Sequence, residues 1–279
     1  IQKDYFLPSL NLKYNLNDKN SLRLGASKTY TLPQAKEISP YRYVGVNFNS
    51  QGNPNLKPSD HYNLDLKWDF NPTPTELISL TAFYKLIKNP ISRIEVASAG
   101  GYLSYENIAD KATVAGVEVE IRKNLFVRPV SNAAHGMNKL SLGLNGSYIY
   151  TNAKMPLATV TTGSQLEGAA PWIVNFDLSH NFTKGERSFV NTLVLNYVSD
   201  KIYTIGTQGY QDMMEQGVLT LDFVSQAKLN KHLSLNLKAR NLLNPSYKLS
   251  RKANENGEKV ILNDYKKGIN ISLGVSCTF

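Results

Sequence analysis

The sequence contains one cysteine, Cys277, among its 279 residues. A single cysteine excludes an internal disulfide framework and a cysteine metal cluster. The sequence also has no apolar run of about 18 residues or more, which excludes a membrane-spanning helix. A membrane protein is not excluded, because a spanning β-strand needs only about 9–11 residues and turns every second one toward lipid.

Motifs for catalysis and for cofactor binding are missing as well. We find no G-x-S-x-G elbow and no phosphate-binding loop, and the four histidines lie in separate segments without metal-ligand spacing. Glu118 and Glu120 share one side of an alternating segment and could do acid–base work. Arg122 follows on the same side, so the preferred interpretation is a row of solvated charges without a catalytic role. Outer-membrane phospholipases and proteases are the rival class, but no nucleophile–base pair stands out. We therefore expect no enzyme, no metal site and no cofactor.

The charge is basic, with 31 Lys and Arg against 22 Asp and Glu and a net charge of +9. A nucleic-acid-binding protein would gather its basic residues on one element with aromatic residues between them, and this sequence shows no such cluster. The excess is therefore interpreted as lysine-rich loops and turns. Such a charge would favour contact with the phosphates of lipopolysaccharide.

Alternation of apolar and polar residues is the dominant pattern and recurs about eleven times. Successive side chains of a strand point to opposite sides, so each such segment predicts one apolar and one polar face. The last segment is apolar at every second position: Ile269, Ile271, Leu273, Val275, Cys277 and Phe279. Earlier segments with the same pattern cover residues 10–16, 22–26, 62–70, 78–86, 117–121, 140–150, 172–178, 193–197, 219–223 and 233–237.

The connections between these segments alternate between short and long. The short ones are 17–20, 71–75, 183–187 and 230–232, with a longer one at 124–138 on the same side. The long ones are 31–59, 88–111, 152–170, 199–216 and 245–263. Short periplasmic turns opposite long extracellular loops are typical of outer-membrane β-barrels.

A soluble β-sandwich would also alternate, but three features favour a membrane barrel. The segments are long, their charges stay on one face, and aromatic residues recur near their ends, as in the girdles at the two membrane interfaces. The terminal Phe279, on the apolar face, resembles the insertion signal of bacterial outer-membrane barrels. We therefore predict an all-β fold, a transmembrane antiparallel β-barrel.

Four strings of the sequence resemble TonB-dependent receptors, and together they cover roughly the whole chain. GNPNLKPS at 52–59 is similar to the family's G-N-P-x-L-K-P-E, with Ser59 in place of the acidic residue. AFYK at 82–85 is similar to the next strand of those barrels. YEN at 105–107 with AGVEVE at 115–120, and NLLN at 241–244 followed by Tyr247, resemble two further elements.

The same strings also have a local structural interpretation. Gly52 and Pro54 suit a bent loop that enters a strand. Gly116 indicates a close approach or a bulge, and Asn241 and Asn244 can bond nearby backbone at a strand end. We interpret these residues as fold-making and not as ligands.

The resemblance implies more than the fold. Eleven strands would be the C-terminal half of a 22-stranded plugged barrel, so residues 1–279 are expected to form one barrel domain without the plug and the N-terminal strands. The sequence begins at Ile1 without a signal peptide, so we expect a processed chain or a fragment.

The implied function is energy-coupled uptake of a bulky nutrient, such as a chelate or a glycan, across the bacterial outer membrane. The implied partners are outer-membrane lipid and lipopolysaccharide, the rest of the barrel with its plug, the inner-membrane TonB complex and an unknown nutrient. Nucleic acid is not among them. A passive porin and a structural or partner-docking barrel are the alternatives.

Two sets of candidate site residues follow. Tyrosines in or next to the long loops could stack on a ligand, or could simply pack in the loops: Tyr41, Tyr43, Tyr102, Tyr105, Tyr203 and Tyr210. Charges on the polar face could hold a plug, although a water-filled porin would also accept them: Arg23, Asp65, Lys67, Glu118, Glu120, Arg122, Asp177, Asp222 and Lys238.

Overall fold

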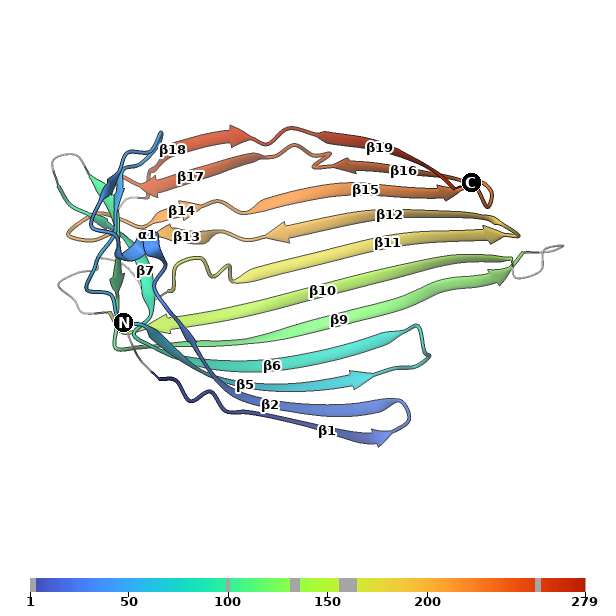
Figure 1. Cartoon of the computed structure of the whole chain (residues 1–279), viewed down its shortest axis with the longest axis horizontal. Helices are drawn as coiled ribbons and strands as arrows, with labels where there is room; N and C mark the ends of the chain where they lie inside the picture. The colour runs from blue at the N-terminus through green and yellow to red at the C-terminus, as the bar shows by residue number, and fades with distance from the viewer. Residues whose placement is uncertain (1–3, 99–100, 131–135, 156–164, 254–256, 279) are drawn as a thin grey trace.

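The computed structural model describes residues 4–98, 101–130, 136–155, 165–253 and 257–278, so Phe279 and its predicted role as insertion signal lie outside the described residues. One eleven-stranded antiparallel sheet dominates the fold, in the order β1-β2-β5-β6-β9-β10-β11-β12-β15-β16-β19 (Figure 1). Its strands are β1 (Ser9–Asn17), β2 (Asn20–Thr31), β5 (Ser59–Phe70), β6 (Leu77–Lys88), β9 (Lys111–Pro129), β10 (Met137–Ala153), β11 (Trp172–Lys184), β12 (Arg187–Val198), β15 (Val218–Lys228), β16 (Leu233–Arg240) and β19 (Asn270–Cys277). The predicted all-β class and the predicted strand number are confirmed.

The long strands are joined by short turns at one end and by long loops at the other (Figure 1). We call these the short-turn end and the long-loop end. Asparagine closes two of the short turns, as its side chain accepts backbone N–H groups two or three residues on. The Asn17 side chain accepts the N–H groups of Lys19 and Asn20, both at 2.9 Å, and the Asn230 side chain accepts that of Leu233 at 2.8 Å. The predicted alternation of short and long connections is confirmed.

One predicted connection, 124–138, is wrong at its ends. β9 continues to Pro129 and β10 already begins at Met137. Asn124 pairs with Ser141 and Phe126 pairs with Leu140, so Leu125 has no opposite residue. This β-bulge inserts one residue into β9. The insertion interrupts the period-2 pattern, which is why the alternation ended too early in the sequence.

The main sheet has one apolar and one polar face, and its apolar face is the more exposed. In β6, Leu80 is 47% exposed while its neighbour Ser79, on the opposite face, is 2% exposed. The apolar face continues across strands, for example from Leu24 to Leu66, because residues opposite each other share a face. A soluble sheet would bury such a face, so the arrangement suits a surface bathed in lipid.

Two glycines allow bulky side chains on the polar face. Phe83 is an apolar residue on this face, and its ring lies over Gly116, where a Cβ would be 2.4 Å from the ring. The same Cβ would be 2.4 Å from the carbonyl oxygen of Tyr148. A Cβ at Gly143 would be 2.1 Å from the carboxylate of Asp177. The close approach expected at Gly116 is therefore confirmed.

The long loops contain strands that the sequence did not indicate. The first loop sheet has the order β3-β4-β8-β7, and the second has the order β13-β14-β17-β18. Their elements, with one short helix beside the first sheet, are α1 (Ala35–Ile38), β3 (Arg42–Tyr43), β4 (Ser50–Gln51), β7 (Ile91–Val96), β8 (Tyr102–Asn107), β13 (Lys201–Thr204), β14 (Met213–Glu215), β17 (Ser246–Lys252) and β18 (Lys259–Lys266). A parallel bridge between Ile94 and Ile205 connects the two sheets.

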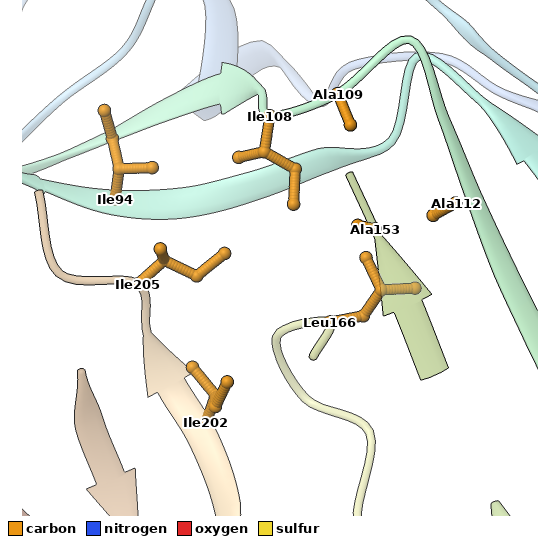
Figure 2. Packing of buried hydrophobic residues seen from close by; sticks show 8 residues of the cluster. All are labelled: Ile94, Ile108, Ala109, Ala112, Ala153, Leu166, Ile202 and Ile205. Carbon is orange, nitrogen blue, oxygen red and sulfur yellow. The ribbon is translucent and has the colours of Figure 1, made fainter. Parts of the chain in front are cut away.

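The buried apolar residues of the chain lie mainly at the long-loop end. Ile205 is 0% exposed and packs with Ile94, Ile202 and Leu166, which come from three different loops (Figure 2). Small residues such as Ala112, at the start of β9, complete this cluster. The loops therefore have a core of their own on top of the main sheet.

β1 and β19 form the two edges of the main sheet, and these described strands do not pair with each other. The sheet is therefore open, as expected for part of a larger barrel. Within the described residues, no helix is long and apolar enough to cross a membrane.

A pair of arginine substitutions in β12 tests the face assignment. Leu193 lies near the middle of the strand on the apolar face and is 42% exposed, and Thr192 lies beside it on the polar face. Leu193→Arg should destabilise the folded barrel by about 2–4 kcal/mol, because it places a charge in hydrocarbon. Thr192→Arg should cost much less. Denaturant unfolding in lipid vesicles measures both, and equal losses would contradict the assignment.

A second pair of variants tests the close packing at Gly116. Gly116→Ala should destabilise by about 1–3 kcal/mol, because the new methyl group collides with a backbone carbonyl as well as with a ring. Gly146→Ala in β10 is the matched control, since a Cβ there would meet nothing within 4 Å. The same unfolding assay applies. An unchanged midpoint for Gly116→Ala would show that the strands separate more easily than the structure indicates.

Candidate functional site

A cavity of about 610 Å³ lies at the long-loop end, lined by residues from both loop sheets. Its volume falls in the range of small-ligand sites, roughly 300–1,000 Å³. The first sheet, α1 and the segment between β3 and β4 contribute Lys36, Asn47, Phe48, Ser50, Arg93, Leu103 and Tyr105. The second contributes Tyr203, Glu215, Tyr247, Lys248, Leu249, Asn263 and Tyr265. Both loop sheets are needed to form this site.

Aromatic rings make up much of the cavity wall. Tyr247 and Tyr265 are opposite each other in β17 and β18, and their rings stack with centroids 5.5 Å apart. Phe48 and Tyr203 meet across the two sheets with centroids 6.4 Å apart and planes tilted by 41°. Such faces can bind flat rings by stacking and cations through the ring face.

The charged groups on the cavity are mostly positive. Lys36, Arg93 and Lys248 line it, and Glu215 is the one carboxylate among the lining residues. Glu215 is paired with Lys201 at 3.4 Å, so its charge is partly neutralised. Lys248 is likewise paired with Asp264, at 3.8 Å. With three cations and one carboxylate among the lining residues, the cavity favours an anionic ligand.

Arg93 is held from several sides. Its Nη2 lies 2.8 Å from Oε1 of Glu167, and its backbone N–H donates to Oε2 of Glu167 at 2.5 Å. Its Nε donates to the carbonyl oxygen of Tyr203 at 3.2 Å, and its guanidinium lies 4.0 Å from the centroid of the Tyr203 ring. Burial raises the pKa of Glu167, and the bonds and charge of Arg93 partly offset this rise. Burial likewise raises the pKa of Tyr105.

A second guanidinium–carboxylate pair joins the two loop sheets. Arg251 of β17 is ion-paired with Glu95 of β7, and the ring of Tyr210 lies 5.2 Å from the Arg251 guanidinium. The hydroxyl of Thr207 donates to the carbonyl oxygen of Glu95. Glu95 and Arg251 are both largely buried, so breaking the pair would leave an uncompensated charge. The pair therefore helps to keep the cavity walls together.

A small apolar cluster that packs against Phe48 and Tyr203 connects the two loop sheets. Leu103 of β8, Met213 of β14 and Leu249 of β17 are buried together, and Phe48 and Tyr203 pack against them. Two of these residues, Leu103 and Leu249, also line the cavity. The position of the rings thus depends on contacts between loops far apart in the sequence.

The strings at 52–59 and 105–107 contact each other directly. The Asn107 side chain accepts the N–H of Lys57 at 2.8 Å and donates to its carbonyl oxygen at 3.0 Å. The same amide donates to the carbonyl oxygen of Asn89 at 2.9 Å, and Asn53 donates to that of Tyr105 at 3.0 Å. These bonds support the interpretation of both strings as fold-making.

The string at 241–244 forms the turn after β16. Asn241 and Asn244 have positive φ angles of 58° and 43°, which asparagine tolerates better than most residues. The Asn241 amide donates to the carbonyl oxygen of Gly268 at 2.7 Å, and the N–H of Gly268 donates to Asn244 at 3.1 Å. The turn is thereby tied to the start of β19, and its role here is structural.

The structure brings two of the six candidate tyrosines to the cavity, Tyr105 and Tyr203. The others do not line it. Tyr43 lies under Lys36 and Tyr102 under Arg42, with ring centroids 5.6 and 5.5 Å from the cations. Tyr41 is 75% exposed.

Sequence reasoning missed several cavity residues, among them Arg93, Tyr247 and Tyr265. Tyr247 belongs to a string that resembles the family, and Tyr265 lies just after the predicted long connection at 245–263. Alternation within the loop at 259–266 could have indicated β18, but nothing in the sequence indicates that this strand faces the loop of Arg93.

The nine predicted lumen charges share the polar face of the main sheet, away from the cavity lining. Residues that are opposite each other in neighbouring strands share a face. Arg23 is opposite Lys67, and Gly143 is opposite both Arg122 and Asp177. Some are paired within the face: Arg23 lies 3.3 Å from Asp69, and Arg122 lies 2.8 Å from Glu120. Asp69, which is 5% exposed and also binds Lys67 at 3.5 Å, was not predicted.

Comparisons with known proteins place this geometry among outer-membrane proteins. A family model described as TonB dependent receptor-like, beta-barrel, matches residues 2–242. An iron-regulated outer membrane virulence protein of Vibrio cholerae serotype O1 is 25% identical over 228 residues, which cover 78% of this chain and 32% of that protein. The chain therefore spans about a third of the length of the curated relatives it matches.

Solved structures share the fold at low sequence identity. A mutant of the ferric enterobactin receptor PfeA of Pseudomonas aeruginosa is 18% identical with a TM-score of 0.59, over 98% of this chain and 40% of that one. The ferric yersiniabactin uptake receptor FyuA of Yersinia pestis is 15% identical with a TM-score of 0.60, over 98% and 37%. The copper transporter OprC is 16% identical with a TM-score of 0.64, over 98% and 39%.

Asn107 offers a test of the fold-making interpretation. Asn107→Ala should destabilise the loops by about 1–3 kcal/mol, because the backbone N–H and carbonyl oxygen of Lys57 lose their partner. Limited proteolysis should then cut the 52–58 segment faster. Asn55→Ala is the control within the same string, because Asn55 is exposed and makes no side-chain hydrogen bond within the described residues. Equal proteolysis of the two variants would contradict the interpretation.

Proposed function

Since the chain belongs to the TonB-dependent receptor β-barrel family, we propose that it forms part of the wall and five extracellular loops of a receptor that takes up a bulky anionic chelate. Members of this family are receptors and transporters of the bacterial outer membrane, so the apolar face of the main sheet contacts lipid. The proposal assigns the long-loop end to the extracellular side and the short-turn end to the periplasm.

The lining of the cavity carries the proposal. Three cations and several tyrosine rings surround a space of about 610 Å³. A metal chelated by deprotonated aromatic oxygens has both properties that such a lining recognises, negative charge and flat ring faces. Fold neighbours that are named as ferric enterobactin and ferric yersiniabactin receptors agree with a chelate.

A free metal ion is the second candidate, because one fold neighbour is named a copper transporter. The cavity does not favour it. Its cations would repel a positive ion, and its lining residues include no histidine, cysteine or methionine, which copper prefers. Within the described residues, no group of three or more His, Cys, Asp or Glu side chains could hold a metal ion.

The proposal also gives a role to the main sheet, which forms part of the barrel wall. We assign the nine charges of the polar face, together with Asp69, to contacts with a plug inside the barrel, because charges held away from water need partners. The open edges β1 and β19 would pair with further strands of the barrel, since unpaired backbone groups cost several kcal/mol each in hydrocarbon. Residues 1–279 then act as one barrel domain. The inner-membrane TonB complex would supply the energy, and lipopolysaccharide would contact the outer rim.

A passive porin and a partner-docking barrel are the rivals. A porin needs an open lumen, whereas the loops here form a packed core and a lined cavity. The intact protein in a planar bilayer should therefore conduct ions poorly. A large, steady open conductance would favour the porin.

Binding of two matched probes tests the proposed ligand class on the intact receptor, purified in detergent. One is a tethered ferric tris-catecholate, which is triply negative. The other is a tethered ferric tris-hydroxamate with phenyl groups, which carries rings but no net charge. The anionic probe should bind more tightly. Lys36→Gln and Lys248→Gln should each weaken it by about tenfold, or about 1.4 kcal/mol.

Lys231→Gln is the control, because Lys231 lies in the turn between β15 and β16 at the short-turn end. It removes the same charge far from the cavity. Equal affinity for both probes, or no loss in the two cavity variants, would overturn the proposed ligand class.

A further inference from the structure

We propose that Arg93 determines the charge selectivity of this cavity and that Glu167 is a positioning residue that presents the Arg93 guanidinium to an anionic ligand. This inference rests on the proposed function, in which the cavity is the ligand site. It assigns separate roles to two residues that the sequence did not single out.

The backbone of Arg93 is fixed on both sides. Arg93 pairs with Tyr105 in β8 on one side, and its carbonyl oxygen accepts the N–H of Ile205 at 3.0 Å on the other. The flanking Ser92 and Ile94 are 3% and 4% exposed, and Ile94 lies in the core between the loops (Figure 2). The side chain of Arg93 therefore starts from a rigid position.

Glu167 is also fixed through its neighbours. Leu166 is buried in the same core, and its N–H donates to the hydroxyl of Thr151 at 3.0 Å. Gly168 donates to the carbonyl oxygen of Ile202 at 2.9 Å and has a φ of +75°, which glycine adopts without strain. The carboxylate between these two anchors has little freedom to leave Arg93.

The bonds of Arg93 leave part of its guanidinium for a ligand. A guanidinium carries five N–H donors in a rigid plane. One of them goes to Glu167 and another, at Nε, goes to Tyr203, while the Tyr203 ring covers one face. Within the described residues, no further hydrogen bond of the guanidinium is present. Because Arg93 lines the cavity, the remaining donors can bind two oxygens of an anion at once.

Arg251 provides an internal comparison. Like Arg93, it has a carboxylate partner, Glu95, and a ring nearby, Tyr210. It does not line the main cavity. Loss of Arg251 should therefore loosen the loop sheets without changing which charge the cavity prefers.

Glu167 could instead act only through its negative charge, and the two roles predict opposite signs. A carboxylate that merely adds negative charge beside the cavity repels an anion, so Glu167→Gln would tighten binding of the anionic probe. If the carboxylate positions Arg93, Glu167→Gln would instead weaken binding of the anionic probe. The carboxylate uses one oxygen for the backbone N–H and the other for the guanidinium. Glutamine has a single carbonyl oxygen as acceptor, so Arg93 would lose its fixed orientation.

The experiment measures equilibrium binding of the ferric tris-catecholate and of the neutral ferric phenyl-hydroxamate to the intact receptor in detergent. Arg93→Gln should weaken the anionic probe by about tenfold or more relative to the neutral probe, because only the anionic probe loses a charge-assisted bond. Arg93→Lys should recover only part of the loss, because an ammonium cannot form the planar fork. Arg251→Gln should change both probes to a similar extent.

A double-mutant cycle then tests the positioning role. Glu167→Gln should weaken the anionic probe, and it should have no further effect in the Arg93→Gln background, because it acts through Arg93. Tighter binding by Glu167→Gln, or an equal effect in both backgrounds, would overturn this role.

The outcomes also separate this inference from the proposed ligand class. If the anionic probe binds and the Lys36 and Lys248 variants weaken it, but Arg93→Gln does not, the ligand class stands and the selectivity role of Arg93 is wrong. If Arg93→Gln weakens both probes equally, as Arg251→Gln does, Arg93 is only a structural residue. If neither probe binds, the proposed ligand class itself fails.

Discussion

Every backbone N–H and C=O in the hydrocarbon of a bilayer needs a partner within the protein, because no water is there to bind it. The main sheet meets this requirement with an unbroken series of antiparallel pairs from β1 to β19. The alternation of side chains is a consequence, since each strand then has one face toward lipid and one toward the lumen. The exposed Leu80 beside the buried Ser79 illustrates this separation.

The loops obey a different rule, because they extend into water. They cannot rely on lipid to accept their apolar residues, and they bury them among themselves around Ile205. Their backbones also pair with each other, in the two small loop sheets. The cavity lies where these sheets meet, so its lining is decided by contacts between loops and not by any one loop.

Charge is used differently in the two regions. On the polar face of the wall, charges are arranged in cross-strand rows, with partial pairing such as Arg23 with Asp69. At the loops, two arginines are each fixed by one carboxylate and one tyrosine ring, Arg93 by Glu167 and Tyr203, Arg251 by Glu95 and Tyr210. Both loop arginines link segments far apart in the sequence, which makes them sensitive to the arrangement of the loops.

The sequence by itself determined the strands of the main sheet, the sides of their turns and the faces of their side chains, because all of these follow from a local period of two residues. It also indicated the family, through strings such as GNPNLKPS, although the bond of Asn107 with Lys57 joins two strings 50 positions apart. The bulge at Leu125 was missed because one inserted residue breaks the period. The meeting of Arg93 with Glu167 and with the ring of Tyr203 was decided only by the tertiary structure. Those contacts join residues more than 70 positions apart, and a local pattern carries no information about which distant loops will share a core.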